Sequence, residues 1–129
     1  MNYCELRIMN HARCSISNDA AFYQITAINA LENKCMLSGA REGEWIPLIN
    51  IKPIKITPEL LDELGFKFFK GGFGWDKYVK GSVILSVIPV RTKGLLLGYK
   101  LEKDYRYIRY IHELENLYYA LIGVDLYQY

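Results

Sequence analysis

Histidine and cysteine side chains are the first candidates for chemistry, because they supply most of the metal ligands and proton carriers of proteins. The chain has two histidines and three cysteines. Cys4, His11, Cys14 and Cys35 offer zinc ligands, but they lack the paired, closely spaced cysteines of structural zinc sites. The odd number of cysteines also speaks against a disulfide framework. We therefore expect buried, reduced cysteines and no metal or other cofactor.

His112 and Glu115 stand three residues apart, a spacing that brings two side chains together on a helix. Such a pair can transfer protons, and Glu113 is a second candidate partner. However, no motif ties a serine or cysteine nucleophile to either pair. The alternative interpretation is a histidine that anchors the helix to a neighbouring strand. We predict from this that the protein is not an enzyme.

The segment from Gly71 to Gly74 is rich in glycine, and such loops can bring backbone amides close to an anion. It lacks the Lys-Ser/Thr pair of a phosphate-binding loop, and it lies between expected strands. A hairpin tip is the alternative interpretation. Phe73 and Trp75 lie in or next to this tip, where such rings either fold back onto the core or meet a partner.

Positive charge is concentrated in residues 65–109, which carry a net charge of +7, whereas residues 1–64 carry −2 and residues 110–129 carry −3. Tyrosine is also abundant, and Tyr105–Arg109 reads YRYIR. Arginine next to tyrosine suits a ligand with a phosphate and a base, and it suits protein interfaces equally well. Ordinary packing of the tyrosines, on a sheet edged with solvated lysines, is the third interpretation.

These patterns predict a non-enzymatic protein that binds an anionic, nucleotide-like small molecule. We expect a homo-oligomer, because clefts between subunits supply the pockets that a small domain lacks. The first alternative is a module that binds a host protein. A nucleic-acid-binding protein is the third choice, because the last helix offers no basic recognition surface. The residues expected to bind the ligand are Trp75, Tyr78, Tyr105, Arg106, Arg109 and His112.

The chain of 129 residues predicts one α+β domain, with an antiparallel, β-rich front half. A boundary within 47–57 would instead give sub-lobes 1–50 and 57–129. Residues 2–8 fit a helical turn or a first strand. We expect strands at 22–31, 35–37 and 44–46, with a turn at Asn18-Asp19. Pro47, Pro53 and Pro58 exclude a helix through 47–57, which we expect to be an extended connector.

A short helix is expected at 58–64, because Thr57 can cap it and Gly65 can end it. A β-meander follows, with strands at 66–69, 76–80, 82–90, 95–101 and 105–109. Strand 82–90 is apolar at nearly every position, which predicts a central strand covered on both faces. A long helix over 110–122, ended by Gly123, has one apolar face. No run approaches the roughly 20 apolar residues that cross a bilayer, so we expect a cytoplasmic protein without a membrane partner.

ITPELLDELGF (Ile56–Phe66) and YIHELENLYYALIG (Tyr110–Gly123) resemble two motifs of a family of small uncharacterised proteins from phages and prophages of gut bacteria. Members open with a Glu-Leu-Arg-Ile-Gly-Asn-like stretch, and here Met9 replaces the glycine within Glu5–Asn10. The glycine implies a tight turn, which Met9 does not favour. The resemblance implies a phage-linked origin and the cytoplasm of a host cell, but no activity. By analogy with phage accessory proteins, it suggests an antagonist of host defence that binds a host protein or sequesters a nucleotide signal.

Overall fold

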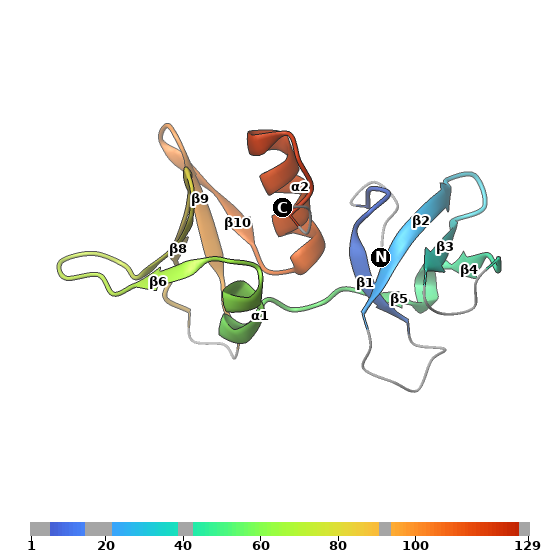
Figure 1. The fold of residues 1–129 in the computed structure, drawn as a ribbon, viewed down its shortest axis with the longest axis horizontal. Coiled ribbons are helices and arrows are strands. Elements are labelled where there is room, and N and C mark those ends of the chain that lie inside the picture. Colours follow the sequence, from blue (N-terminus) through green and yellow to red (C-terminus); the bar gives the residue numbers. More distant parts are fainter. Residues whose placement is uncertain (1–5, 15–21, 39–42, 91–93, 127–129) are drawn as a thin grey trace. The chain divides into compact units, whose positions relative to one another are not determined.

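The computed structural model describes residues 6–14, 22–38, 43–90 and 94–126, and it divides the chain into two compact units. The first unit comprises residues 1–54 and 110–116, and the second comprises residues 55–109 and 117–129. Each contains a five-stranded antiparallel sheet (Figure 1). The fold is therefore α+β and mostly β, as the sequence predicts. The chain passes from one unit to the other after Ile54, after Arg109 and after Asn116, and the first of these points lies within 47–57, where the sequence allows a boundary.

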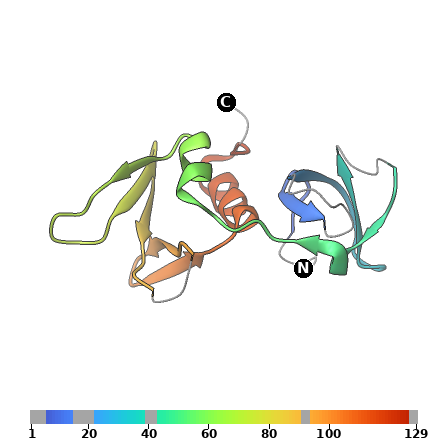
Figure 2. The same cartoon turned by 90° about the horizontal axis from the view of Figure 1, so that it is seen from below.

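The first sheet has the strand order β4-β3-β2-β1-β5, and its side chains form one apolar core. Its elements are β1 (His11–Cys14), β2 (Tyr23–Asn29), β3 (Lys34–Ser38), β4 (Ile46–Pro47), the 3-10 turn η2 (Leu48–Asn50) and β5 (Ile51–Lys52). All five strands contribute to the core, including Ile46 and Ile51 from the two edge strands. The sheet therefore curls around its own buried face (Figure 2).

One expectation for the front half is wrong. Residues 47–57 are not simply an extended connector, because they contain η2 and then β5, whose Lys52 pairs with Arg13 of β1. Proline is tolerated there, since Pro47 lies on an edge strand and Pro53 follows β5. The first described strand begins at His11, after the turn at 8–9, and the expectation for residues 2–8 falls mostly outside the described residues. The turn predicted at Asn18-Asp19 lies outside the described residues.

The opening turn forms even though Met9 stands where the resembled family has glycine. Met9 adopts a φ of 81°, in the left-handed region that favours glycine. The backbone N–H of Met9 donates to the carbonyl of Ile25 at 2.8 Å, and that of Asn10 donates to the carbonyl of Arg7 at 3.0 Å. These bonds hold the methionine in a conformation that its side chain disfavours.

Buried polar side chains connect this turn to the start of helix α2 (Ile111–Ile122) within the first unit. Glu115 is 2% exposed, and it accepts a hydrogen bond from the His11 backbone N–H at 2.8 Å. Its other oxygen lies 2.7 Å from His11 Nδ1. Asn10 is fully buried and donates to Asn116 Oδ1 at 2.9 Å. Glu115 therefore pairs with His11, 104 residues away, and not with His112.

The second sheet has the order β10-β9-β8-β7-β6 and follows the short helix α1. Its elements are α1 (Pro58–Glu63), β6 (Lys67–Phe69), β7 (Lys77–Lys80), β8 (Val83–Val87), β9 (Leu97–Leu101) and β10 (Asp104–Ile108). Thr57 caps α1 by accepting from the Leu60 N–H at 3.2 Å, and Gly65 follows with a φ of 91°. Both expected helices and all five strands of the meander are confirmed, with bounds that shift by a few residues.

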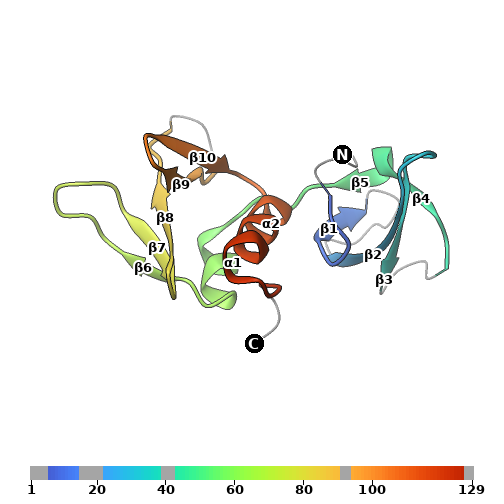
Figure 3. The ribbon, with the colours of Figure 1, turned by 90° about the horizontal axis from the view of Figure 1, so that it is seen from above.

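Helices cover one face of this sheet, which Figure 3 shows from above. Lys80 of β7 donates to the carbonyl of Leu64, at the end of α1, at 2.6 Å. The same ammonium lies 5.2 Å from the ring of Tyr118 in α2. Burial lowers the pKa of Lys80. Because β-strand side chains alternate, the buried Tyr78 and its cross-strand neighbour Leu85 share this face.

The other face of the second sheet is open, so the expectation that strand 82–90 is covered on both faces is wrong. β8 is the central strand of the order, but its Ile84 is 48% exposed. An apolar strand thus lies in a sheet with helices on one side only. No helix in the described part of the chain is long and apolar enough to cross a lipid bilayer.

Replacing Met9 with glycine is expected to stabilise the protein by about 1 kcal/mol, because glycine adopts a positive φ without strain. Urea unfolding of the wild type and of Met9→Gly measures the difference. Met9→Ala is the matched control, since it shortens the side chain but keeps the strained Cβ. Equal effects of the glycine and alanine variants would show that backbone strain is not the cause.

Removing the buried carboxylate of Glu115 is expected to cost about 2–4 kcal/mol of unfolding free energy, because it leaves the partly buried donors of His11 without their acceptor. Thermal and urea unfolding of Glu115→Ala test this. Glu113→Ala, on the same helix, is the comparison. Glu113 accepts from the Tyr110 N–H at 3.1 Å, as a capping side chain does, so its loss should cost about 1 kcal/mol. Similar losses for both variants would contradict the prediction.

Stability is expected to fall in alkaline solution partly because of Cys35. Burial, and then the neighbouring Cys14, raise the pKa of Cys35 from 9.0 to about 11. The folded state therefore holds this proton in a window where the unfolded chain has lost it, and stability falls as the pH rises from 9.0 towards 11. Urea unfolding at several pH values should show a shallower fall for Cys35→Val than for the wild type. Parallel curves would exclude the thiol as a cause.

Candidate ligand-binding site

The open face of the second sheet carries polar, charged and aromatic side chains, and the strand register places them together. Lys77 pairs with Ser86 across β7 and β8, and Ser86 pairs with Gly98 across β8 and β9. Lys100, two residues beyond Gly98, pairs with Tyr105 of β10. Directly paired residues point to the same side of a sheet, so these side chains share the face opposite the helices.

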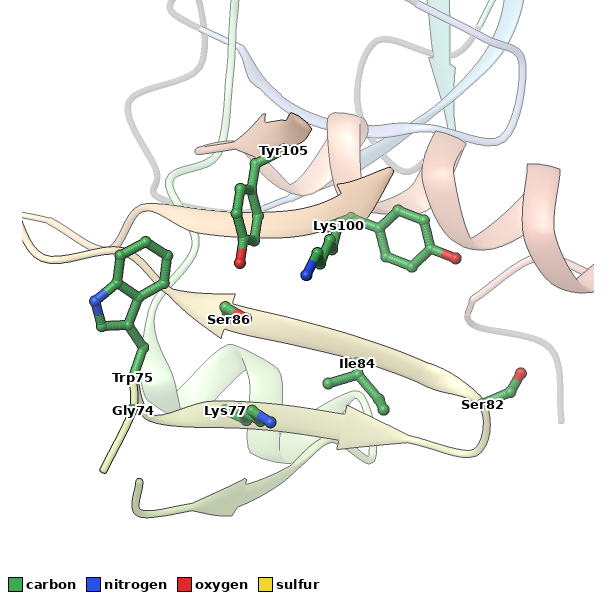
Figure 4. Close-up of a pocket in the computed structure, with 9 residues that line it drawn as sticks. Gly74, Trp75, Lys77, Ser82, Ile84, Ser86, Lys100 and Tyr105 are labelled. Carbon is green, nitrogen blue, oxygen red and sulfur yellow. The ribbon is translucent and has the colours of Figure 1, made fainter. Parts of the chain in front are cut away.

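A hollow of about 590 Å³ lies on this open face. Figure 4 shows labelled side chains of β7, β8, β9 and β10 around it, together with Gly74 and Trp75 before β7 and Ser82 before β8. The short side chain of Ser86 on β8 leaves room between the longer groups. Its lining residues are Gly74, Trp75, Lys77, Ser82, Ile84, Ser86, Tyr99, Lys100 and Tyr105.

Two aromatic rings form one end of the hollow. The ring centroids of Trp75 and Tyr105 are 5.7 Å apart, and the ring planes are tilted by 52°. The Tyr105 ring approaches the backbone of Gly98 so closely that a Cβ there would be 2.9 Å from its Cδ1 atom. Gly98 thus sets how deep this ring lies. Trp75 remains 43% exposed, which leaves ring surface for a ligand.

The hairpin that carries Trp75 is fixed at its base. The Gly71 N–H donates to the Asp76 carboxylate at 2.9 Å, and the Val87 N–H donates to the Asp76 carbonyl at 2.8 Å. A Cβ on Gly71 would lie 2.3 Å from the carbonyl oxygen of Gly74, so the turn requires glycine. The two rings of this segment behave differently. Trp75 folds back onto the sheet, whereas Phe73 at the tip is fully exposed.

Lys77 and Lys100 make the hollow electropositive. Both are exposed, and neither forms an ion pair with an acidic side chain in the described part of the chain. Two such ammonium groups attract an anion at a distance, and they bind its oxygens on contact. The hydroxyl of Ser86, on the strand between them, adds a donor that can serve the same anion.

The hollow brings together only some of the residues that the sequence singled out. Trp75 and Tyr105 both line it. Tyr78 was expected to be exposed, but it is 7% exposed on the covered face, where its ring lies 5.2 Å from that of Phe68. Burial, followed by the charges of nearby acids, raises its pKa. Arg106 is exposed but alternates with Tyr105, so it belongs to the other face. Arg109 follows the end of β10 and does not line the hollow.

The proton-transfer and metal candidates lie outside this hollow. His112 belongs to the first unit, is 2% exposed, and stacks on Tyr110 with ring centroids 5.9 Å apart. Cys14 and Cys35 are buried thiols, and Cys4 lies outside the described residues. Among the residues that the structure describes, no group of three or more His, Cys, Asp or Glu side chains could hold a metal ion.

Sequence reasoning missed Lys77, Lys100 and Ser86. The alternation of side chains along each strand does give a signal for them. Leu85 and Leu97 are expected to face a core, and the next residues, Ser86 and Gly98, are then expected to face away from it. Local sequence gives no pairing register, however, and only the register shows that Lys77 and Lys100 flank the same serine.

Comparisons with protein-family profiles, with curated proteins and with solved structures find no match for this chain. The resemblance to the phage and prophage family accordingly stays a prediction from the motifs. The candidate site rests on its own geometry.

Proposed function

We propose that this protein binds, without chemical conversion, an anionic ligand that carries a flat ring, of nucleotide type, in the hollow of the second sheet. One observation carries the proposal: Trp75 and Tyr105 stand beside Lys77 and Lys100 on one open face, around a serine. The base of a nucleotide would stack on the indole of Trp75. Its phosphate would lie over Ser86, between the two ammonium groups.

The free energies expected from these contacts suit reversible binding. Stacking of a base on an aromatic side chain contributes about 1–3 kcal/mol, and a charge-assisted hydrogen bond contributes about 1.5–3 kcal/mol. After the cost of association, such a set supports affinities in the micromolar range.

The proposal includes no proton transfer, since the His11–Glu115 pair holds the first unit together and His112 is buried. Sequestration of a defence signal in a host cell is the role that the family resemblance suggests.

Binding of a protein partner is the second candidate, and Phe73 favours it. An exposed phenylalanine between glycines, on a hairpin fixed by Asp76, is suited to insertion into an apolar pocket of another protein. The two functions differ in their key residues, because Phe73 does not line the hollow. A ligand that binds Phe73→Ser as tightly as the wild type uses the hollow and not the tip.

Fluorescence of Trp75 provides the test, in a Trp45→Phe background that leaves one tryptophan. AMP, ATP and cyclic dinucleotides are titrated, and at least one should change the emission with a micromolar dissociation constant. Lys77→Gln and Lys100→Gln should each weaken that binding about tenfold, because each removes one contact to phosphate. Added salt should weaken it further.

Lys55→Gln is the matched control, since it removes an exposed lysine of the second unit that does not line the hollow. It should leave the affinity within about twofold of the wild type. Calorimetry of Trp75→Ala checks the stacking contribution without relying on fluorescence. The proposal is wrong if none of the nucleotides binds at millimolar concentration, or if the lysine variants bind as tightly as the control.

A further inference from the structure

The outer edge of β10 has a defined pattern of unused backbone groups. In the described part of the chain, β10 pairs with β9 alone. The two-residue turn at 102–103 makes Leu101 and Asp104 the bonded pair that closes this hairpin. Bonded and non-bonded pairs alternate along antiparallel strands, so the N–H and C=O groups of Tyr105 and Tyr107 point away from β9.

A hydrogen bond at the end of the strand independently indicates the same outward direction for these backbone groups. The carbonyl of Arg109, two residues after Tyr107, points outward and accepts from the Ile56 N–H at 3.1 Å. The connector before α1 thus occupies the edge at Arg109. The outer edge from Asp104 to Tyr107 has no partner strand among the described residues.

The side chains along this edge carry opposite charges at a regular spacing. Asp104 and Arg106 are both exposed and, two residues apart, share one face of the strand. Neither forms an ion pair with another residue of the described chain. A strand with a negative and a positive residue two positions apart is complementary to an antiparallel copy of itself.

We propose that the outer edge of β10 pairs antiparallel with the same strand of a second copy, forming a two-fold symmetric dimer with Tyr105 on the axis. The outward N–H and C=O of Tyr105 then bond to the same groups of the second copy. Asp104 of each copy faces Arg106 of the other, so symmetry produces two ion pairs. Residues directly opposite in this way have Cβ atoms about 4.5–5.5 Å apart.

Other registers are less favourable. An axis at Arg106 would place the two guanidinium groups of that residue directly opposite each other, and like charges in that position are destabilising. An axis at Tyr107 would pair Tyr105 with Arg109, whose outward carbonyl already accepts from Ile56. Charge and hydrogen bonding therefore select the same axis.

The dimer would join two binding faces without covering them. Its axis runs perpendicular to the sheet, so the open faces of both copies lie on the same side and form one continuous sheet of ten strands. The two hollows would then be neighbours through Tyr105. The contact is short, so we expect a reversible dimer with a dissociation constant on the order of 10–100 µM.

Sedimentation velocity of the full chain over a range of concentrations, in low salt, tests the proposal. Asp104→Arg and Arg106→Asp should each weaken the dimer at least about tenfold, because each places like charges across the axis. The double variant should restore it, since the pairs re-form with exchanged signs. Asp62→Arg makes the same charge change on an exposed position of α1 and should leave the dimer intact. A wild-type monomer at all concentrations, or a dimer that the single variants leave unchanged, overturns the proposal.

Cross-linking tests the position of the axis. In a Cys4→Ser background, Tyr105→Cys should form a disulfide-linked dimer under mild oxidation, because residues opposite themselves across the axis have Cα atoms about 5.5 Å apart. Tyr107→Cys is the control, because it lies two positions from the axis and should remain largely monomeric. Equal cross-linking at both positions overturns the register. Neither experiment contains a ligand, so failure of the dimer and failure of the proposed binding function remain distinguishable.

Discussion

Lys77 pairs with Ser86 and Lys80 pairs with Val83 across β7 and β8, and this register decides what each face of the second sheet can do. The helices require one apolar face, so Leu85 points towards them and Lys80 reaches the end of α1. A slip of one residue would put Lys77 on the same face as Leu85, so that either the lysine would be buried or the leucine exposed. Burial of the apolar side chains on the covered face thus fixes the register, and the register in turn places the lysines of the hollow on the open face.

The same alternation explains why the strong positive charge of residues 65–109 is not itself a binding site. Lys80 is used within the fold, at the helix terminus and over Tyr118. Arg106 points to the face opposite the hollow. Lys77 and Lys100 are the cations that the strands bring beside Trp75 and Tyr105. Total charge raises the local potential for any anion, whereas specificity depends on the few cations that share a surface with the rings.

Local sequence signals predicted many of the helices and strands, whereas the contacts between residues far apart in the sequence could not be predicted from them. Thr57 and Gly65 mark the ends of α1 through a hydrogen bond and a positive φ that involve only near neighbours, so the sequence predicted them. The pairing of Glu115 with His11 depends on the first sheet bringing distant segments together, and the helical spacing pointed to His112 instead. In the candidate site, Trp75 and Tyr105 were predicted from their residue types. The sequence did not show that Tyr78 lies on the opposite face from these two rings, because successive side chains of a strand point to alternate faces and only the register assigns the faces.

The turn at 102–103 couples the hollow to the edge of the sheet. Because it has two residues, Tyr105 pairs with Lys100, and its ring therefore lies on the open face next to Trp75. The same turn length makes Asp104 a bonded pair with Leu101 and so directs the backbone of Tyr105 outward. One more residue in the turn would change the pairing and reverse both directions. The side chain of Tyr105 can serve the hollow while its backbone remains available to a second strand, because in a β-strand the two point in perpendicular directions.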